Sequence, residues 1–198
     1  MLFTRYPEAG NTKTRLIPSL GAAKAAELQR WMTATMAREM AVLGPGIDRQ
    51  VHFSGGGLSQ MQTWLGGQFT YRPQVAGGLG HRLQQAFRGN FEAGMEAVVA
   101  IGADCPQLSA NHFEQAFQQL QTHDVVLGPA VDGGYYLIGL RGHQAQLFEE
   151  IPWGTGEVFE RTVAIATHLD LSIATLEKLR DVDRPEDLDW FNQILMCI

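Results

Sequence analysis

Three aspartates follow segments that the sequence predicts to be extended, and carboxylates at such places can hold a divalent cation. Asp104 comes just after five apolar residues, 97–101, which predict a strand buried on both faces of a parallel sheet. Asp181 and Asp183 alternate, so both point to one side if that backbone is extended. Together the three predict an oxygen-rich site suited to Mg²⁺ or Mn²⁺. The alternative is that each only caps a turn or a helix.

Two basic residues, Lys13 and Arg15, lie within three positions in a predicted loop, 6–18, beside the hydroxyls of Thr12 and Thr14. Arginine can hold phosphate oxygens through two parallel hydrogen bonds, and lysine supplies a mobile point charge. We therefore predict a site for a polyphosphate. The alternative is an ordinary solvated basic loop.

A glycine-rich turn, with Gly77, Gly78 and Gly80 among four residues, opens onto a predicted helix at 83–91. Glycine lets the backbone approach a planar base or a ribose closely, and a helix N-terminus favours an anion. The spacing matches neither the Walker loop nor the GxGxxG dinucleotide motif. By itself this turn is therefore a weak indication of nucleotide binding.

A second carboxylate turn comes from Asp132, Gly133 and Gly134, just past the predicted strand 124–127. In parallel sheets such turns meet at one edge, so we expect it near Asp104. Asp132 is either a ligand-facing group or only a turn former. Downstream, Trp153 either stacks on a ligand or is simply buried.

The elements that position these residues alternate between strands and helices, which predicts an α/β fold. Short apolar or alternating segments predict further strands at 1–5, 50–54, 69–72, 135–140 and 171–176. Apolar residues at helical spacing predict helices at 28–43, 58–65, 113–120, 144–151, 157–168 and from 185 onward.

Length and composition fit one α/β domain over residues 1–198, without a linker-like segment. The net charge of −6 argues against a nucleic-acid backbone or an anionic membrane as the main partner. No apolar run approaches the roughly 20 residues of a membrane span. Cys105 and Cys197 show neither metal spacing nor a disulfide framework, and no secretion signal is evident, so we expect a cytoplasmic protein.

Taken in order, these motifs resemble the nucleotide-diphospho-sugar transferase superfamily, which has the GT-A fold. More narrowly, the chain resembles a bacterial group often labelled glycosyltransferase and related to 2-phospho-L-lactate guanylyltransferase, and more distantly to the molybdenum-cofactor guanylyltransferases. The matching stretches span nearly the whole chain: YPEAGNTKTRL, GGLGHR, GADCPQL, GPAVDGGYYLIGL, IPWGTG and DVDRPEDL. The resemblance implies a single-domain, Rossmann-like, three-layer α/β/α fold with a mainly parallel mixed sheet. Relatives begin with several more apolar residues, so either the first strand here is truncated or the start of the sequence is misassigned.

The resemblance also implies a role for each matching residue. The nucleotide phosphates would be bound by Lys13, Thr14 and Arg15, and the base or ribose by Gly77, Gly78, Gly80 and Arg82. The metal would be held by Asp104, Asp183 and Asp181. The acceptor or sugar would face Asp132, Gly133, Gly134 and Trp153. Catalysis would rest on Lys13, Arg15 and Asp104.

We therefore expect metal-assisted nucleotidyl transfer, in which a phosphate or hydroxyl of a small acceptor attacks the α-phosphorus of a nucleoside triphosphate and pyrophosphate leaves. The first alternative is a glycosyltransferase that uses a nucleotide-diphospho-sugar and releases a nucleoside diphosphate. The second is a nucleotide-binding protein without turnover. The KTRL sequence at 13–16 favours nucleotidyl transfer over both alternatives.

Overall fold

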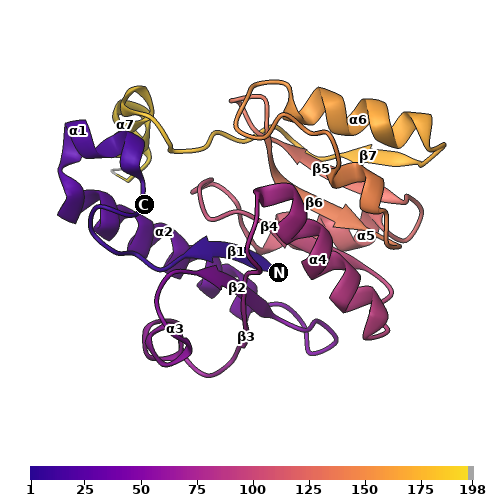
Figure 1. Ribbon diagram of the computed structural model, residues 1–198, viewed down its shortest axis with the longest axis horizontal. Helices are drawn as coiled ribbons and strands as arrows, with labels where there is room; N and C mark the ends of the chain where they lie inside the picture. The colour runs from indigo at the N-terminus through magenta and orange to yellow at the C-terminus, as the bar shows by residue number, and fades with distance from the viewer. Residues whose placement is uncertain (196–198) are drawn as a thin grey trace.

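The computed structural model describes residues 1–195, and the side chains among them up to 193; Cys197 lies outside these residues. They form one α/β domain with a seven-stranded sheet of order β3-β2-β1-β4-β6-β5-β7 (Figure 1). The strands are β1 (Leu2–Arg5), β2 (Gln50–Ser54), β3 (Thr70–Pro73), β4 (Val98–Ile101), β5 (Val125–Pro129), β6 (Tyr135–Leu140) and β7 (Ile173–Thr175). Only β6 runs antiparallel to its neighbours, β4 and β5. The expected mainly parallel mixed sheet is confirmed.

Helices cover both faces of the sheet. They are α1 (Ile17–Leu20), α2 (Ala22–Ala41), α3 (Leu58–Leu65), α4 (Leu79–Glu92), α5 (Ala110–Gln119), α6 (Val158–His168) and α7 (Leu188–Leu195). Three 3₁₀ turns join them: η1 (Thr14–Leu16), η2 (Ala145–Phe148) and η3 (Pro185–Asp187).

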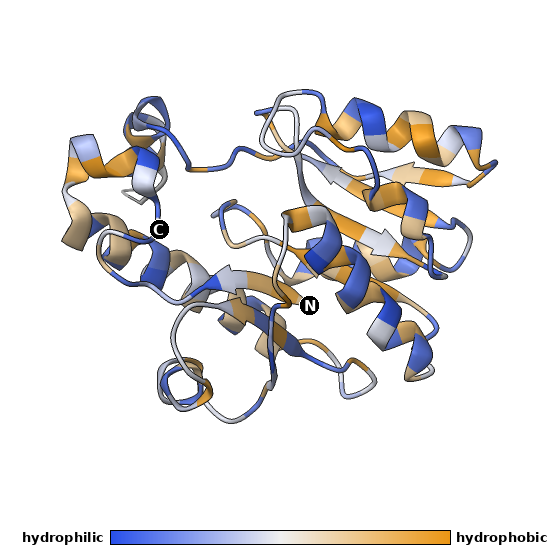
Figure 2. Cartoon of the chain, viewed as in Figure 1, coloured by the Kyte–Doolittle hydropathy of each residue, from blue (hydrophilic) through white to orange (hydrophobic). Residues whose placement is uncertain are grey.

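The central strand β4 shows why its sequence is apolar at every position. Val99 and Ile101 pack in one core, together with residues of α2, α3 and α5. Val98 and Ala100 pack in a second core, against α4, α6 and η2. Because helices lie over both faces, the strand has no solvent side, and the apolar colour runs through the middle of the sheet in Figure 2. The expected three-layer arrangement follows from these two cores.

The first strand, β1, spans four residues. It pairs with β2 along its whole length, from Leu2 with Val51 to Arg5 with Ser54. With β4 it pairs only at Leu2, opposite Ile101. Because β1 points the same way as its parallel neighbours, the loop after Arg5 still reaches the edge of the sheet where Asp104 lies.

Two predicted helices need correction. The segment 144–151 forms only the turn η2, because Glu150 adopts a positive φ of 53° and Pro152 follows it. The helix expected from Pro185 begins as the turn η3 and becomes α-helical only at Leu188.

The last helix packs away from the strand that precedes it. In Figure 1 the chain leaves β7, crosses the end of the sheet and places α7 beside α1 and α2. A small separate core joins these parts, formed by Leu16, Met32, Val182 and Phe191. The crossing segment, 176–184, thereby carries Asp181 and Asp183 over the edge where the parallel strands end. No helix within the described residues has the length and apolarity needed to cross a membrane.

Acid should weaken this fold through His52 on β2. The imidazole is 5% exposed, stacks on Phe3 and pairs through Nε2 with Gln50 Oε1 at 2.9 Å. Burial lowers the pKa of His52 from 6.5 to about 3. Below pH 6.5 the unfolded chain therefore binds a proton that the folded chain does not, and the free energy of unfolding falls by up to about 1.4 kcal/mol per pH unit.

Urea unfolding at several pH values between 6.5 and 4.5 measures this slope. His52→Gln should flatten it, whereas His143→Gln, at an exposed histidine, should keep the wild-type slope. An unchanged slope in His52→Gln would show that the acid sensitivity has another source.

Candidate active site

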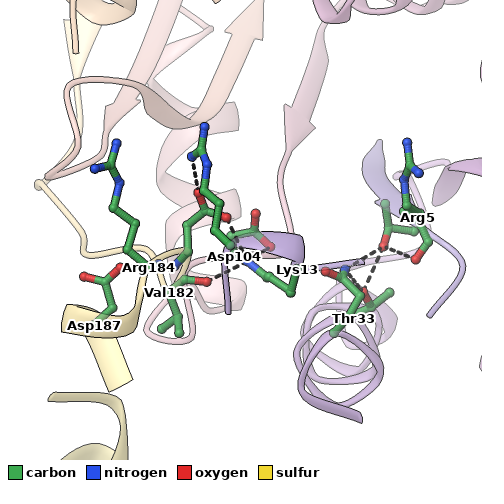
Figure 3. A network of polar contacts seen from close by, with 11 residues as sticks. Arg5, Lys13, Thr33, Asp104, Val182, Arg184 and Asp187 are labelled. Atoms are coloured by element: carbon green, nitrogen blue, oxygen red, sulfur yellow. Dashed lines mark hydrogen bonds and ion pairs between the residues drawn. The ribbon is translucent and has the colours of Figure 1, made fainter. Parts of the chain in front are cut away.

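A buried ammonium group lies at the centre of the candidate site. Lys13 Nζ is 2.8 Å from Asp104 Oδ1 and donates a 2.6 Å hydrogen bond to the carbonyl oxygen of Val182 (Figure 3). Asp183 Oδ1 lies 3.8 Å away on the other side. The Lys13 side chain is only 3% exposed. One cation therefore joins the loop after β1, the loop after β4 and the segment that crosses from β7.

The loop before Lys13 is folded tightly on itself. The Thr12 hydroxyl and the backbone N–H of Asn11 both donate to the carbonyl oxygen of Glu8. Lys13 itself adopts the left-handed conformation, with φ of 47°, which is costly for a residue with a Cβ. The ion pair with Asp104 and the burial of Leu16 in the small core offset that cost.

Arg15 is the accessible member of the basic pair. Its side chain is 55% exposed, and Nη1 donates to Asp183 Oδ2 at 2.5 Å. The guanidinium therefore keeps donors that face solvent at the mouth of the site. Of the two cations, Arg15 is the one that a solute can reach without a rearrangement of the core.

The crossing segment is held in an extended conformation over the sheet edge. Its backbone pairs with β5 and the following residues, since Leu179 N–H donates to Pro129 O and Val131 N–H donates to Leu179 O. Val182 N–H donates to Asp104 O at 2.9 Å. Asp181 and Asp183 flank that bond, and the segment thus lies directly against the loop after β4.

Asp181 faces other carboxylates. Burial, together with the negative charges of Asp132 and Asp104 among its neighbours, raises the pKa of Asp181 to about 6. Asp104, Asp132, Asp181 and Asp183 all line one cavity of about 370 Å³, which Arg15 also lines. Negative charge in this cavity exceeds what Arg15 and Lys13 compensate.

These oxygens fit a hard divalent cation in chemistry, and the raised pKa of Asp181 marks charge that a cation would neutralise. Their present arrangement is not a preformed cage. In the described part of the chain, no three Asp, Glu, His or Cys side chains are grouped so that they could hold one ion. Asp104 instead pairs with Lys13, and Asp183 with Arg15.

The glycine-rich turn wraps the start of α4. Gly77 has φ of 120°, and Arg82 Nε donates to its carbonyl oxygen at 2.7 Å. Gly78, the residue before the helix, has open space where a Cβ would lie. Gly80 has a different reason to be glycine. A Cβ there would lie 2.6 Å from Trp153 Nε1 and 2.6 Å from Phe148 O. Protein packing, and not a ligand, fills the space beside Gly80.

The turn at 132–134 packs against the Trp153 loop in a similar way. Gly133 has φ of 88°, and a Cβ on it would overlap the backbone of Gly156. Asp132 Oδ1 accepts the Gly134 N–H at 2.8 Å, as expected of a turn former, while the carboxylate also lines the cavity. Trp153 is partly buried and lines the same cavity.

Two residues have structural roles beyond what the sequence pattern indicates, although Asp187 is expected in the first turn of a helix. Gln74 follows β3 and donates to His52 O at 2.8 Å and to Thr4 O at 3.2 Å, while its Oε1 accepts from Arg82 Nη1. Asp187 accepts the backbone N–H groups of Asp183 and Arg184 and pairs with Arg180. The signal for Asp187 was its spacing from Arg184, three residues ahead of it at a helix start. Gln74 carried no such signal.

A family model described as "Uncharacterized protein conserved in bacteria (DUF2064)" matches residues 38–155, more than half of the chain. The chain belongs to this family. The matched part of this DUF2064 chain contains Asp104, Asp132 and the glycine-rich turn, whereas Lys13 and Arg15 come before it.

Among solved structures, the chain is similar to one named "putative nucleotide-diphospho-sugar transferase", from Desulfovibrio desulfuricans G20. The two share 34% identity with a TM-score of 0.87, over 92% of this chain and 80% of the other. No similar protein was found among the curated proteins.

Two nucleotide-using enzymes share the fold at low identity. CMP:2-keto-3-deoxy-manno-octonic acid synthetase, solved with CTP, is 11% identical with a TM-score of 0.62, over 98% of this chain and 96% of the other. The 4-diphosphocytidyl-2C-methyl-D-erythritol synthase of Anaerococcus prevotii DSM 20548 is 9% identical with a TM-score of 0.61, over 98% and 95%. At such identity the likeness concerns the fold alone.

The packing of Gly80 is testable with a matched pair in one helix. Gly80→Ala should destabilise the protein by about 1 to 3 kcal/mol, because its Cβ meets Trp153 and the Phe148 carbonyl. Gly89→Ala, also in α4 but with open space around its Cβ, should stabilise the protein by up to about 1 kcal/mol. Urea unfolding of both variants measures the difference. Equal effects at the two positions would show that α4 does not approach Trp153 closely.

The buried ion pair gives a second stability test. Asp104→Asn leaves the Lys13 ammonium buried without its nearest anion, and because Asp104 is itself half exposed we expect a loss of about 1 to 3 kcal/mol. Glu92→Gln, which breaks the exposed pair with Arg88, should cost at most about 0.5 kcal/mol. If urea unfolding shows the two losses to be equal, Lys13 does not depend on Asp104.

Proposed function

We propose that this chain is a transferase that moves a nucleotidyl group from a nucleoside triphosphate to a small phosphorylated or hydroxylated acceptor. An acceptor oxygen forms a bond to the α-phosphorus, the bond from that phosphorus to the bridging oxygen breaks, and pyrophosphate leaves. A phosphate acceptor brings an ionised oxygen; a hydroxyl acceptor gives its proton to the departing pyrophosphate. The chain need not supply a nucleophile.

One observation carries the proposal: Lys13 and Arg15 lie together at the carboxyl edge of the sheet, beside Asp104 and Asp183. Ligands of open α/β sheets bind at this edge. Arg15 is exposed and can exchange Asp183 for the oxygens of a phosphate. Lys13 adds positive charge from its buried position, where it also holds Asp104 in place. Thr14, with Gly77, Gly78 and Arg82 of the glycine-rich turn, would contribute to the rest of the nucleotide site.

A divalent cation, Mg²⁺ or Mn²⁺, would be held by Asp104 with Asp181 and Asp183. When bound it would neutralise charge on the phosphates. Asp132, Gly134 and Trp153, which line the cavity, would face the acceptor. Neither a nucleic acid nor a membrane is a partner in this proposal.

The second candidate is glycosyl transfer from a nucleotide-diphospho-sugar, and the name of the Desulfovibrio protein favours it. The two reactions differ in what leaves. Nucleotidyl transfer releases pyrophosphate, whereas glycosyl transfer releases a nucleoside diphosphate.

The deciding experiment incubates the protein with each nucleoside triphosphate or nucleotide sugar, Mg²⁺ or Mn²⁺, and a panel of small acceptors. We expect pyrophosphate and an acceptor that carries the nucleoside monophosphate. A nucleoside diphosphate formed only from a nucleotide sugar would establish the second candidate. Tight binding without any product would identify a binding protein that does not turn over.

Arg15→Lys tests the phosphate contact. A point charge cannot replace a planar fork that holds two oxygens, so affinity for the triphosphate should fall about tenfold, or about 1.4 kcal/mol. Arg88→Lys is the control, because Arg88 is equally exposed, at 55%, and also pairs with a carboxylate, but lies outside the cavity. Calorimetry measures both affinities. Equal affinity for the two variants would make the loop an ordinary solvated turn.

A further inference from the structure

The cavity at the sheet edge has two chemically different ends. Its charged residues, Arg15 and the four aspartates, belong to the loops beyond the strands. The part of its wall between α4 and the sheet is mainly apolar and includes Phe3, Leu79, Leu83, Ile138, Trp153 and Val158, with the rings of Tyr135 and Tyr136 beside them. The charged end suits the reacting phosphates, so the apolar end must take another part of a substrate.

The apolar end is built from the second core itself. Leu83, Ile138 and Val158 are at most 5% exposed, so they form its floor. Trp153 and Tyr135 meet edge to face, with ring centres 6.1 Å apart, and form part of its wall. The close approach of α4 at Gly80 fixes Trp153 in this wall. The surface presents mainly ring and aliphatic carbon to the cavity.

A nucleotide base fits this surface poorly. The edge of a base carries several donors and acceptors, and each one buried without a partner is costly. No charged or amide side chain lies in this wall to satisfy such an edge. Of the hydroxyls that also line the cavity, Tyr136 Oη donates to Glu177 O and Thr155 Oγ1 donates to Pro152 O, while Tyr135 Oη is buried. Polar side chains lie outside this cavity, at Gln74 and Arg82, which line a neighbouring pocket beside the glycine-rich turn. The apolar end is thus left to the acceptor.

We infer that the acceptor carries a compact apolar group, such as an aromatic ring or a short branched chain, next to its reacting phosphate or hydroxyl. The apolar group packs on Leu79, Leu83 and Trp153, while the reacting oxygen reaches the charged end. This inference rests on the proposed function and names the class of its acceptor. A polyhydroxylated acceptor such as a free sugar would have to bury its hydroxyls against carbon, and is excluded on the same ground.

The experiment compares two phosphate monoesters of equal charge, benzyl phosphate and glycerol 1-phosphate. Their binding to the full chain is measured by calorimetry with Mg²⁺, with and without a non-hydrolysable nucleoside triphosphate analogue. We expect benzyl phosphate to bind at least tenfold more tightly, which corresponds to about 1.4 kcal/mol. Equal affinity, tighter binding of glycerol 1-phosphate, or no binding of benzyl phosphate at millimolar concentration would overturn the inference.

A matched pair of variants locates the preference. Leu79→Gln changes the first residue of α4, which is 45% exposed and lines the cavity, and should reduce the preference several-fold. Leu58→Gln is the control, because Leu58 is the first residue of α3, is 49% exposed and lies outside the cavity. Both positions are exposed, so neither change removes a buried side chain from the core. A preference equally reduced, or unchanged, in both variants would overturn the assignment to this wall.

The inference and the proposed function fail differently. Binding of the two esters requires no turnover, so it can be measured even if only a nucleotide sugar proves to be the donor. Conversely, pyrophosphate release with glycerol 1-phosphate at a kcat/KM equal to or above that with benzyl phosphate would confirm nucleotidyl transfer and reject the apolar acceptor.

Discussion

The site depends on a single buried cation. Lys13 Nζ binds Asp104 and the Val182 carbonyl oxygen and faces Asp183, so three loops that are distant in sequence meet at one charge. A buried ammonium group is costly unless each donor is satisfied, and that cost makes the arrangement specific. If any of these partners moves, Lys13 loses its compensation. The left-handed backbone of Lys13 and the crossing of 176–184 are both explained by this requirement.

The sheet and the small core together keep the Lys13 ammonium group shielded from solvent. Six parallel strands bring their loops to one edge, and the crossing segment closes over it because α7 is anchored beside α1 and α2. Val182 takes part in both systems: its side chain is fully buried in the small core, and its carbonyl oxygen accepts from Lys13. Stability of the terminal helix is thereby coupled to the geometry of the site.

Much of the fold could be predicted from local pattern. The buried strand at 97–101, the strand at 135–140 and the amphipathic helices carried periodicities that the structure confirms. The weaker predictions concerned features set by tertiary contact. Residues 144–151 have helical spacing, yet Leu147 and Phe148 are drawn into the second core as a 3₁₀ turn. Likewise, the ion pair between Lys13 and Asp104 joins positions 91 residues apart. The local sequence around a loop lysine does not indicate which carboxylate it will pair with.

In both glycine turns, a glycine that resembles part of a ligand-binding motif is required by packing within the protein. Gly80 and Gly133 belong to stretches that resemble ligand-binding loops, yet a Cβ at either would collide with the chain around Trp153. Gly78 alone of these three leaves open space. The close packing at Gly80 and Gly133 places Trp153 at the apolar end of the cavity. The carboxylates lie at the other end. The same contacts that stabilise α4 and the 132–134 turn therefore divide the cavity into a carbon-lined half and a charged half, and a substrate must match both.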